Sequence, residues 1–161
     1  MNKLIHIFKL LLLCSLFLIC TESIANTNSS NVESENVTLV KDFFKNVISN
    51  LDIKKMPVYF SPDAVQYVNN QAISLKQDIQ IHGDVYQKTK KIEYHFDDIF
   101  GCGDKVVARL RFNHVDDNGQ DHWFREIFIV QIKDHKIKTM WDLFLPLEPY
   151  KTVNTKMIVP K

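Results

Sequence analysis

The stretch IEYHFDDIFGCGDKVVARLRFNHVDDNGQDHWFREIFIVQIKDHKIKTMWDLF, residues 92–144, decides the fold. Apolar and polar side chains alternate along it with a period of two, which is typical of half-buried β-strands. Polar or glycine-containing turns divide the stretch into four runs, Ile92–Phe100, Val106–Val115, His122–Ile132 and Lys136–Phe144. The sequence therefore predicts a meander of four antiparallel strands.

Helical patterns precede this meander. Apolar residues recur at three- and four-residue spacing over Val37–Leu51, which predicts an amphipathic helix. A short helical piece is expected over Ile53–Tyr59 and a first strand over Ala64–Val68. Ser74–Gln77 has the pattern of a capping box, so a third helix is predicted from Leu75 to about Lys90.

Turn chemistry predicts which residues of the meander face inward. A two-residue loop at Asp134-His135 pairs Lys133 with Lys136, and Phe128 then faces Trp141. A loop with Gly119 in the left-handed conformation keeps two arginines off the inner face and pairs Leu110 with Glu126. The predicted inner face of the last two strands is Phe124, Glu126, Phe128, Val130, Ile132, Ile137, Thr139, Trp141 and Leu143.

The opposite face of the sheet carries Trp123, Arg125, Ile127 and Ile129. This set is too apolar for open solvent and too charged for a core. It is typical of an interface, and a homodimer is expected.

The N-terminus has the pattern of a secretory signal. Lys3 and Lys9 precede the apolar run Leu10–Cys20, and small residues at Ser23 and Ala25 suit a signal peptidase. Cleavage is expected after Ala25. The run is about half of the ~20 residues that cross a bilayer, so no stable membrane anchor is expected. The protein is expected to be exported to the bacterial periplasm or secreted.

Composition indicates one globular domain after the signal peptide. The 161 residues are 45% hydrophobic and 24% charged, which excludes a disordered chain. Lys+Arg of 20 against Asp+Glu of 19 argues against nucleic-acid binding. The expected organisation is a signal peptide at 1–25, a flexible lead-in at 26–35, the domain at 36–146 and a C-terminal extension at 147–161.

The order of helix, short helix, strand, helix and curved meander resembles the domain shared by nuclear transport factor 2, ketosteroid isomerase and the SnoaL-like polyketide cyclases. Residues 59–64, YFSPDA, look like the entry to this family's first strand, and residues 133–137, KDHKI, look like the turn before its last strand. The resemblance implies a cone-shaped α+β fold with an open pocket between helices and sheet. Residues 67–70, YVNN, lack the carboxylate that ketosteroid isomerase carries there, so that chemistry is not expected.

Two carboxylates are candidate catalytic residues. Glu126 is predicted among apolar neighbours, where its pKa would rise and suit it to acid–base chemistry. The alternative for Glu126 is an ion pair with an arginine at the rim. Asp98 is the second candidate, with a solvated turn carboxylate as the alternative.

A ligand pocket is predicted next to these carboxylates. His114 and His122 face each other across the hairpin, and a solvated pair is favoured over a metal site, so neither metal nor cofactor is expected. The alternative for the aromatic residues is a filled core. The candidate ligand-binding residues are Tyr59, Tyr67, Tyr94, Phe96, Phe128, Trp141, His114 and His122.

The preferred interpretation is an exported protein that binds a small apolar or amphipathic molecule, or a protein partner, without catalysis. The first alternative is an enzyme of the cyclase, isomerase or dehydratase kind, with a pocket carboxylate as acid or base. The second is a homodimeric structural or assembly module. Fold resemblance alone does not choose among these three classes.

Overall fold

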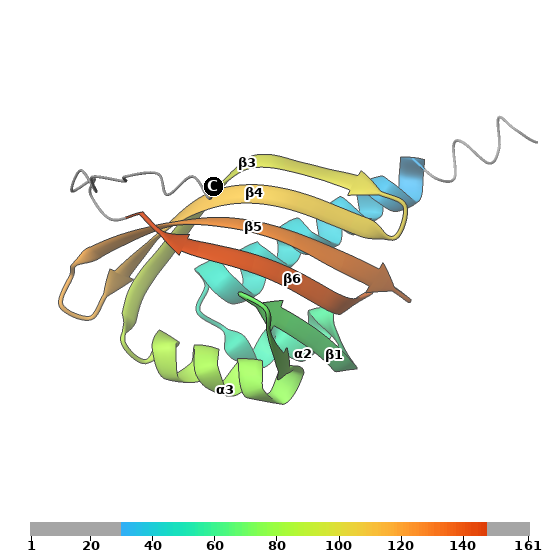
Figure 1. Ribbon diagram of the computed structural model, residues 1–161. Helices are drawn as coiled ribbons and strands as arrows, with labels where there is room; N and C mark the ends of the chain where they lie inside the picture. The colour runs from blue at the N-terminus through green and yellow to red at the C-terminus, as the bar shows by residue number, and fades with distance from the viewer. Residues whose placement is uncertain (1–29, 148–161) are drawn as a thin grey trace, which may run out of the picture.

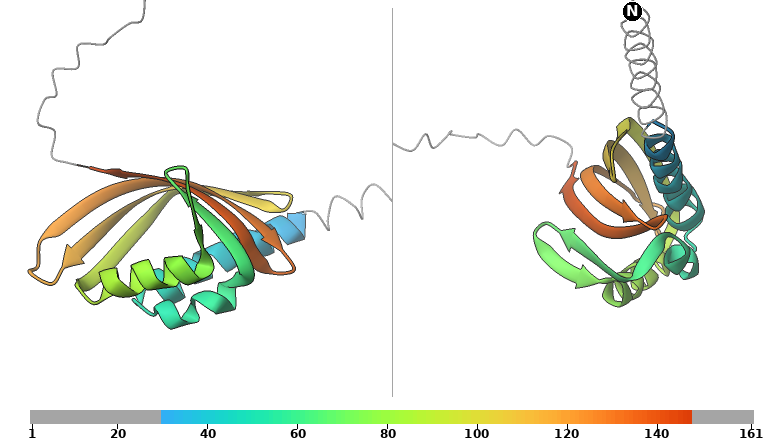
Figure 2. Two further views of the ribbon diagram at one scale, coloured as in Figure 1. Left: turned by 60° about the horizontal axis from the view of Figure 1, so that its bottom comes forward. Right: turned by 90° about the vertical axis from the view of Figure 1, so that its right-hand side faces the viewer.

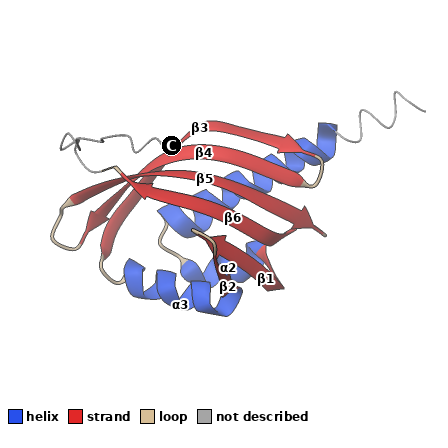
Figure 3. Ribbon diagram, in the orientation of Figure 1, coloured by secondary structure: helices blue, strands red, loops and turns tan. Residues whose placement is uncertain are grey.

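The computed structural model of the protein describes residues 30–147. One curved mixed sheet has the strand order β2-β1-β6-β5-β4-β3, and the helices lie against its concave side (Figures 1 and 2). Helices and strands are segregated into two layers (Figure 3), as in the cone-shaped α+β fold predicted above. The elements after the N-terminal helix (residues 30–43) are η1 (Phe44–Ser49), η2 (Ile53–Lys55), α2 (Met56–Tyr59), β1 (Phe60–Val68), β2 (Gln71–Ser74), α3 (Leu75–Tyr86), β3 (Thr89–Cys102), β4 (Lys105–Asp116), β5 (Asp121–Lys133) and β6 (Lys136–Pro146).

The N-terminal helix and η1 cover the wide part of the sheet. Val40 and Val47 are fully buried, one on each side of the junction between the two helical segments. Phe44 stacks on Phe128 of β5 with a centroid separation of 5.2 Å. These contacts form the main hydrophobic core, in which burying each large side chain stabilises the fold by about 1.5–3 kcal/mol.

The same helix is anchored at its other end to the turn between β3 and β4. The Gly103 N–H donates to Glu33 Oε1 at 3.0 Å, and Asn36 Nδ2 donates to the Gly103 carbonyl at 3.2 Å. The helix therefore already includes residues 30–35, which the sequence assigns to a flexible lead-in.

The β4–β5 hairpin has the predicted register. Asp116 Oδ1 accepts from the N–H groups of Asn118 and Gln120, both at 2.9 Å, and Gly119 has φ +84°. Leu110 pairs with Glu126. The prediction that Glu126 faces inward is confirmed, since it is only 7% exposed.

The β5–β6 hairpin starts as predicted and then changes register. Asp134 and His135 both have positive φ, and Lys133 pairs with Lys136. A bulge follows the Ile132–Ile137 pair, and from there every partner is displaced by one residue, so Phe128 pairs with Asp142. The prediction that Phe128 faces Trp141 is wrong, because a one-residue shift moves each side chain to the other face.

The first strand and the third helix also differ from the predictions. β1 begins at Phe60 rather than at Ala64 and runs parallel to β6, with an irregularity between Phe60 and Val65 that accommodates the predicted turn residues within the strand. The short strand β2 is not predicted. α3 begins at Leu75 as predicted but ends at Tyr86, because β3 already begins at Thr89.

The expected signal peptide, residues 26–29 of the lead-in and residues 148–161 of the extension lie outside the described residues. Within residues 30–147, no helix combines the length and hydropathy that a membrane span needs.

Gly101 tests the docking of the N-terminal helix. A Cβ at this position would lie 2.8 Å from both the Cβ and the carbonyl oxygen of Glu33. We expect Gly101→Ala to lower the free energy of unfolding by about 1–3 kcal/mol, because either the helix or the hairpin must shift. Gly83 in α3 gives the comparison variant, because a Cβ there meets nothing within 4 Å. Gly83→Ala should raise the free energy of unfolding by up to about 1 kcal/mol. Urea denaturation measures both, and equal stabilities for the two variants would contradict the tight packing.

Candidate functional site

A cavity of about 450 Å³ lies between α3, the N-terminal helical segments and the concave face of the sheet. Its lining is mainly apolar, and the size suits a small molecule. The lining residues are Phe43, Phe44, Ile48, Met56, Gln66, Val68, Gln71, Ile73, Asp78, Ile81, His82, Val85, Tyr86, Ile92, Tyr94, Phe112, His114, Phe124, Glu126, Met140, Asp142 and Phe144.

The first polar group in the cavity comes from α3. Reciprocal hydrogen bonds between Ser74 and Gln77 cap this helix. Asp78 and His82 are four residues apart and therefore share a face of the helix, toward the cavity. Asp78 is only 1% exposed, and its Oδ1 lies 2.7 Å from His82 Nδ1.

The Asp78–His82 contact is an ion pair when His82 is protonated. Burial lowers the pKa of His82, but the hydrogen bond and the charge of Asp78 outweigh this effect and raise the pKa above its ordinary value. His82 also meets the ring of Tyr86 edge-on at 5.7 Å. Burial, followed by the charge of Asp78, raises the pKa of the Tyr86 hydroxyl.

The second polar group comes from β5 and β6. The bulge in β6 turns Asp142 toward the cavity, where burial raises its pKa to about 6 despite the lowering effect of His82. Glu126 lies diagonally opposite on β5, because Glu126 pairs with Phe144 and Asp142 pairs with Phe128. Burial first, and then the charge of Asp142, raise the pKa of Glu126 well above its ordinary value.

Several of these buried polar atoms have no partner. Among the described residues, no hydrogen bond reaches Asp142 Oδ1, Asp78 Oδ2, the Tyr86 hydroxyl or Gln66 Oε1. Gln66, on β1, is only 7% exposed. Buried polar atoms are nearly always satisfied in folded proteins, so a set of open atoms around one cavity points to a ligand.

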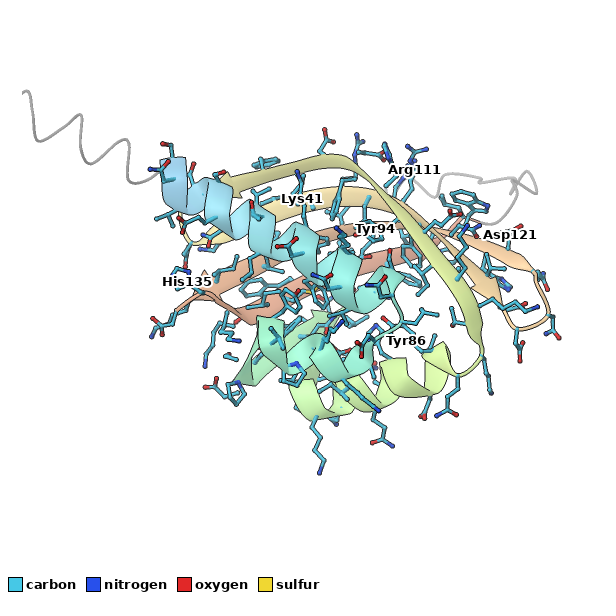
Figure 4. All side chains as sticks on the ribbon, turned by 180° about the vertical axis from the view of Figure 1, so that it is seen from behind. Lys41, Tyr86, Tyr94, Arg111, Asp121 and His135 are labelled. Carbon is cyan, nitrogen blue, oxygen red and sulfur yellow. The ribbon has the colours of Figure 1, made fainter. Side chains whose placement is uncertain are left out.

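The candidate catalytic residues have different locations. Glu126 lines the cavity. Asp98 lies on the outer face of the sheet, where its Oδ2 is 2.8 Å from Arg109 Nη2. The neighbouring pair on that face joins Asp97 to Arg111 at 2.7 Å, and Figure 4 shows Arg111 pointing away from the helices.

Two of the eight candidate ligand-binding residues, Tyr94 and His114, line the cavity. Figure 4 labels Tyr94 on β3 and Tyr86 on α3, on opposite sides of this space. His122 instead lies 3.1 Å from Asp116. Within residues 30–147, no three His, Cys, Asp or Glu residues are arranged to hold a metal ion.

The other five aromatic candidates lie in the core or outside it. Phe128 is fully buried beneath Phe44, and Phe96 packs edge-on against Phe44. Tyr59 accepts a hydrogen bond from Asn46 Nδ2 at 2.8 Å. The sequence places Tyr67 and Trp141 in the pocket, whereas the structure stacks them on the outer face with centroids 6.1 Å apart. The bulge in β6 is the reason for the placement of Trp141.

The predicted interface residues do lie on the outer face. Trp123 is 51% exposed and Ile127 is 44% exposed. Ile129 and Arg125 are exposed beside them. The bulge adds Trp141, Leu143 and Leu145 of β6 to this surface.

The sequence interpretation overlooks Asp78, His82 and Asp142 as site residues. A signal exists for the first two, because the capping box fixes where α3 begins and thereby places Asp78, His82 and Tyr86 on one face. For Asp142 no such signal exists, because the bulge that turns it inward has no glycine or proline to mark it.

Comparison with known proteins identifies a domain family and several solved structures that resemble this chain. The model of the SnoaL-like domain family matches residues 40–140. No curated protein matches the chain significantly. Among solved structures, a Streptomyces galilaeus protein assigned as a hydroxylase has a TM-score of 0.63 at 16% identity, covering 70% of this chain and 79% of its own.

Two further structures have the same fold. An epoxide hydrolase from M. tuberculosis has a TM-score of 0.61 at 16% identity and covers 70% of this chain and 84% of its own. A Jannaschia protein assigned as a SnoaL-like polyketide cyclase has a TM-score of 0.60 at 18% identity, covering 70% of this chain and 86% of its own. At these identities the likeness establishes the fold.

The raised pKa values predict how stability depends on pH. Glu126, Asp142 and His82 all have pKa values above their ordinary ones in the folded state. Protonation therefore favours the folded state, and stability falls as pH rises through these values. His114 has the opposite effect, because burial and the charge of His122 lower its pKa, but three raised groups outweigh one lowered group. We expect the protein to be more stable near pH 5 than near pH 8, with Asp142 contributing about 1–3 kcal/mol.

Urea midpoints at the two pH values measure this difference. Near pH 8, the double variant Glu126→Gln, Asp142→Asn should be more stable than the wild type. Its stability should also differ much less between pH 5 and pH 8 than that of the wild type. Asp134→Asn, in the exposed β5–β6 turn, is the matched control and should keep the wild-type difference between the two pH values. A wild type that is more stable near pH 8 would contradict the assignment.

Proposed function

The chain belongs to the SnoaL-like domain family, and we propose that it is an exported acid–base enzyme that acts on a small, mainly apolar molecule. One observation carries this proposal. Two carboxyl groups with raised pKa values, Glu126 and Asp142, lie with the Asp78–His82 pair in a mainly apolar cavity. Holding charges in such a place costs stability, and active sites are where such arrangements concentrate.

The two carboxyl groups have complementary roles. Asp142, with a pKa of about 6, is mostly ionised near neutral pH and has a free oxygen, so it is the base. Burial, and then the charge of Asp142, raise the pKa of Glu126 well above its ordinary value, and we assign this carboxyl group as the proton donor.

The geometry suits a proton transfer across a small group. The Cα atoms of diagonal neighbours on adjacent strands are about 7–8 Å apart, so one carbon–oxygen unit of a ligand can contact both Asp142 and Glu126. Asp142 removes a proton from carbon, and Glu126 donates one to the oxygen on which charge develops. Burial raises the pKa of Asp142, the charge of His82 lowers it, and the charge of Asp78 raises it. Isomerisation, dehydration and cyclisation all use such a step.

Export is supported by the sequence of residues 1–25, with its two lysines, apolar run and small residues before the expected cleavage site. It would place the acid–base chemistry in the periplasm or outside the cell. The substrate would then reach the cavity without crossing the inner membrane.

Kemp elimination of 5-nitrobenzisoxazole tests the catalytic proposal without knowledge of the natural substrate. In this reaction a base removes one C–H proton and the N–O bond breaks to give a phenolate. We expect saturable turnover that rises with pH through about 6, the pKa of Asp142. Asp142→Asn should lower the rate at least about 100-fold, while Asp134→Asn should leave it unchanged. A wild-type rate no higher than that of free acetate would contradict the enzyme and favour the non-catalytic binder.

We also propose that two copies associate through the outer face of the sheet. The apolar residues there are exposed by 38–62% and lie side by side on β5 and β6, and a grouped apolar surface of this kind marks an interaction site. Its members are Trp123, Ile127, Ile129, Trp141, Leu143 and Leu145.

Sedimentation velocity at micromolar concentration tests this association. We expect a dimer for the wild type and a monomer for Ile127→Lys, because a charge in the centre of the interface has no partner. Val58, on α2, is 60% exposed, so Val58→Lys is the control and should stay dimeric. A wild type that sediments as a monomer would contradict the interface.

A further inference from the structure

The cavity offers negative charge and hydrogen-bond acceptors. Among the described residues that line it there is no lysine or arginine. Gln66 Oε1, Asp78 Oδ2 and Asp142 Oδ1 have no hydrogen-bond partner. The Tyr86 hydroxyl, which is also without a partner, both donates and accepts. These unpaired groups are mainly acceptors, so a ligand that satisfies them must carry hydrogen-bond donors.

The charges inside the cavity do not cancel. The imidazole of His82 is paired with Asp78, so this pair is neutral as a unit when His82 is protonated. Among residues 30–147, no cation is paired with Asp142. Burial, and then the charge of Asp142, make Glu126 harder to ionise. An anionic ligand would be repelled by this arrangement, and a purely apolar ligand would leave buried acceptors unsatisfied.

Gln66 and Asp142 lie close together at the junction of two strands. On β1 and β6, Gln66 pairs with Met140 and Val68 pairs with Asp142. Both side chains line the cavity, and each carries an oxygen that accepts without a partner. Gln66 is uncharged, so its open acceptor points to a donor on the ligand independently of the acidic groups.

An apolar stack lies beside these acceptors on the same face of the sheet. Phe112, Phe124 and Phe144 come from β4, β5 and β6, and adjacent rings stack at 5.0 Å and 4.6 Å. This stack provides flat apolar surface for the body of a ligand. Aromatic faces also attract a cationic nitrogen that lies over them.

We propose that the cavity binds a small, mainly apolar molecule that carries a protonated amine, with the ammonium N–H groups donating to Asp142 and Gln66. The inference concerns the same cavity as the proposed function and names the class of ligand that it takes; such an amine competes with proton abstraction, because both use the Asp142 carboxylate. The ammonium supplies the charge that the cavity lacks, and the apolar body covers the phenylalanine stack.

Isothermal titration calorimetry with three probes of one chain length tests the proposal on the wild-type protein. The probes are octylamine, octan-1-ol and octanoate, which differ only in the head group. We expect octylamine to bind at least about tenfold more tightly than octan-1-ol, because it forms an ion pair in an apolar site. Octanoate should show no saturable binding. Equal or tighter binding of the alcohol or the carboxylate would overturn the inference.

Variants locate the head group. Asp142→Asn should lower octylamine affinity about tenfold and leave octan-1-ol binding unchanged, whereas Asp134→Asn should change neither. Equal octylamine affinities for Asp142→Asn and the wild type would overturn the assignment to Asp142. Kemp elimination separates this inference from the proposed function. If the protein catalyses the elimination but does not prefer octylamine, the proposed enzyme stands and the amine ligand is overturned. If it prefers octylamine but does not catalyse the elimination, the protein binds amines and the proposed enzyme is overturned.

Discussion

The bulge near the start of β6 determines both faces of this sheet. One displaced partner after the Ile132–Ile137 pair moves every later residue of β6 to the opposite side. Asp142 thereby enters the cavity, while Trp141 reaches the outer face and stacks on Tyr67. Without the bulge, the indole would occupy the space of the carboxylate, and Glu126 would lack the neighbour that raises its pKa further. The acidic site and the apolar outer surface thus depend on the same local irregularity.

Electrostatics within the cavity follow from this placement. Asp78, Glu126 and Asp142 come from three elements, and two histidines, His82 and His114, lie with them in the lining. Burial, and then the charge of His122, lower the pKa of His114, so the positive charge comes mainly from His82. The salt bridge to Asp78 holds the imidazole charged, and this charge in turn moderates the rise in the pKa of Asp142. Burial and the neighbouring charges thus raise the pKa values of His82, Asp142 and Glu126 together, so all three groups hold a proton more tightly than they would in water.

Much of the fold follows from the sequence, and less of the site does. The alternation over residues 92–144 and the capping box at Ser74 predict the meander and α3, and the family resemblance is confirmed by the match over residues 40–140. Asp116 and Gly119 form the turn between β4 and β5 by local interactions that can be read from the sequence. This turn sets the register of the hairpin, so the inward position of Glu126 is predicted correctly. The bulge in β6 has no such local signal, since it depends on how β6 fits between β1 and β5. The location of Asp142 is therefore a tertiary property.

The anchor between Glu33 and Gly103 joins residues that are 70 positions apart in the chain. Closing so long a loop is slow compared with forming a helix or a hairpin. In a chain that emerges N-terminus first, the N-terminal helix comes out well before the turn on which it docks. Phe43 of this helix can meet Tyr59 and Phe60 early, but Glu33 has no Gly103 to bind until the β3–β4 hairpin has followed. The end of the helix that carries Glu33 therefore docks late, when most of the domain is already available.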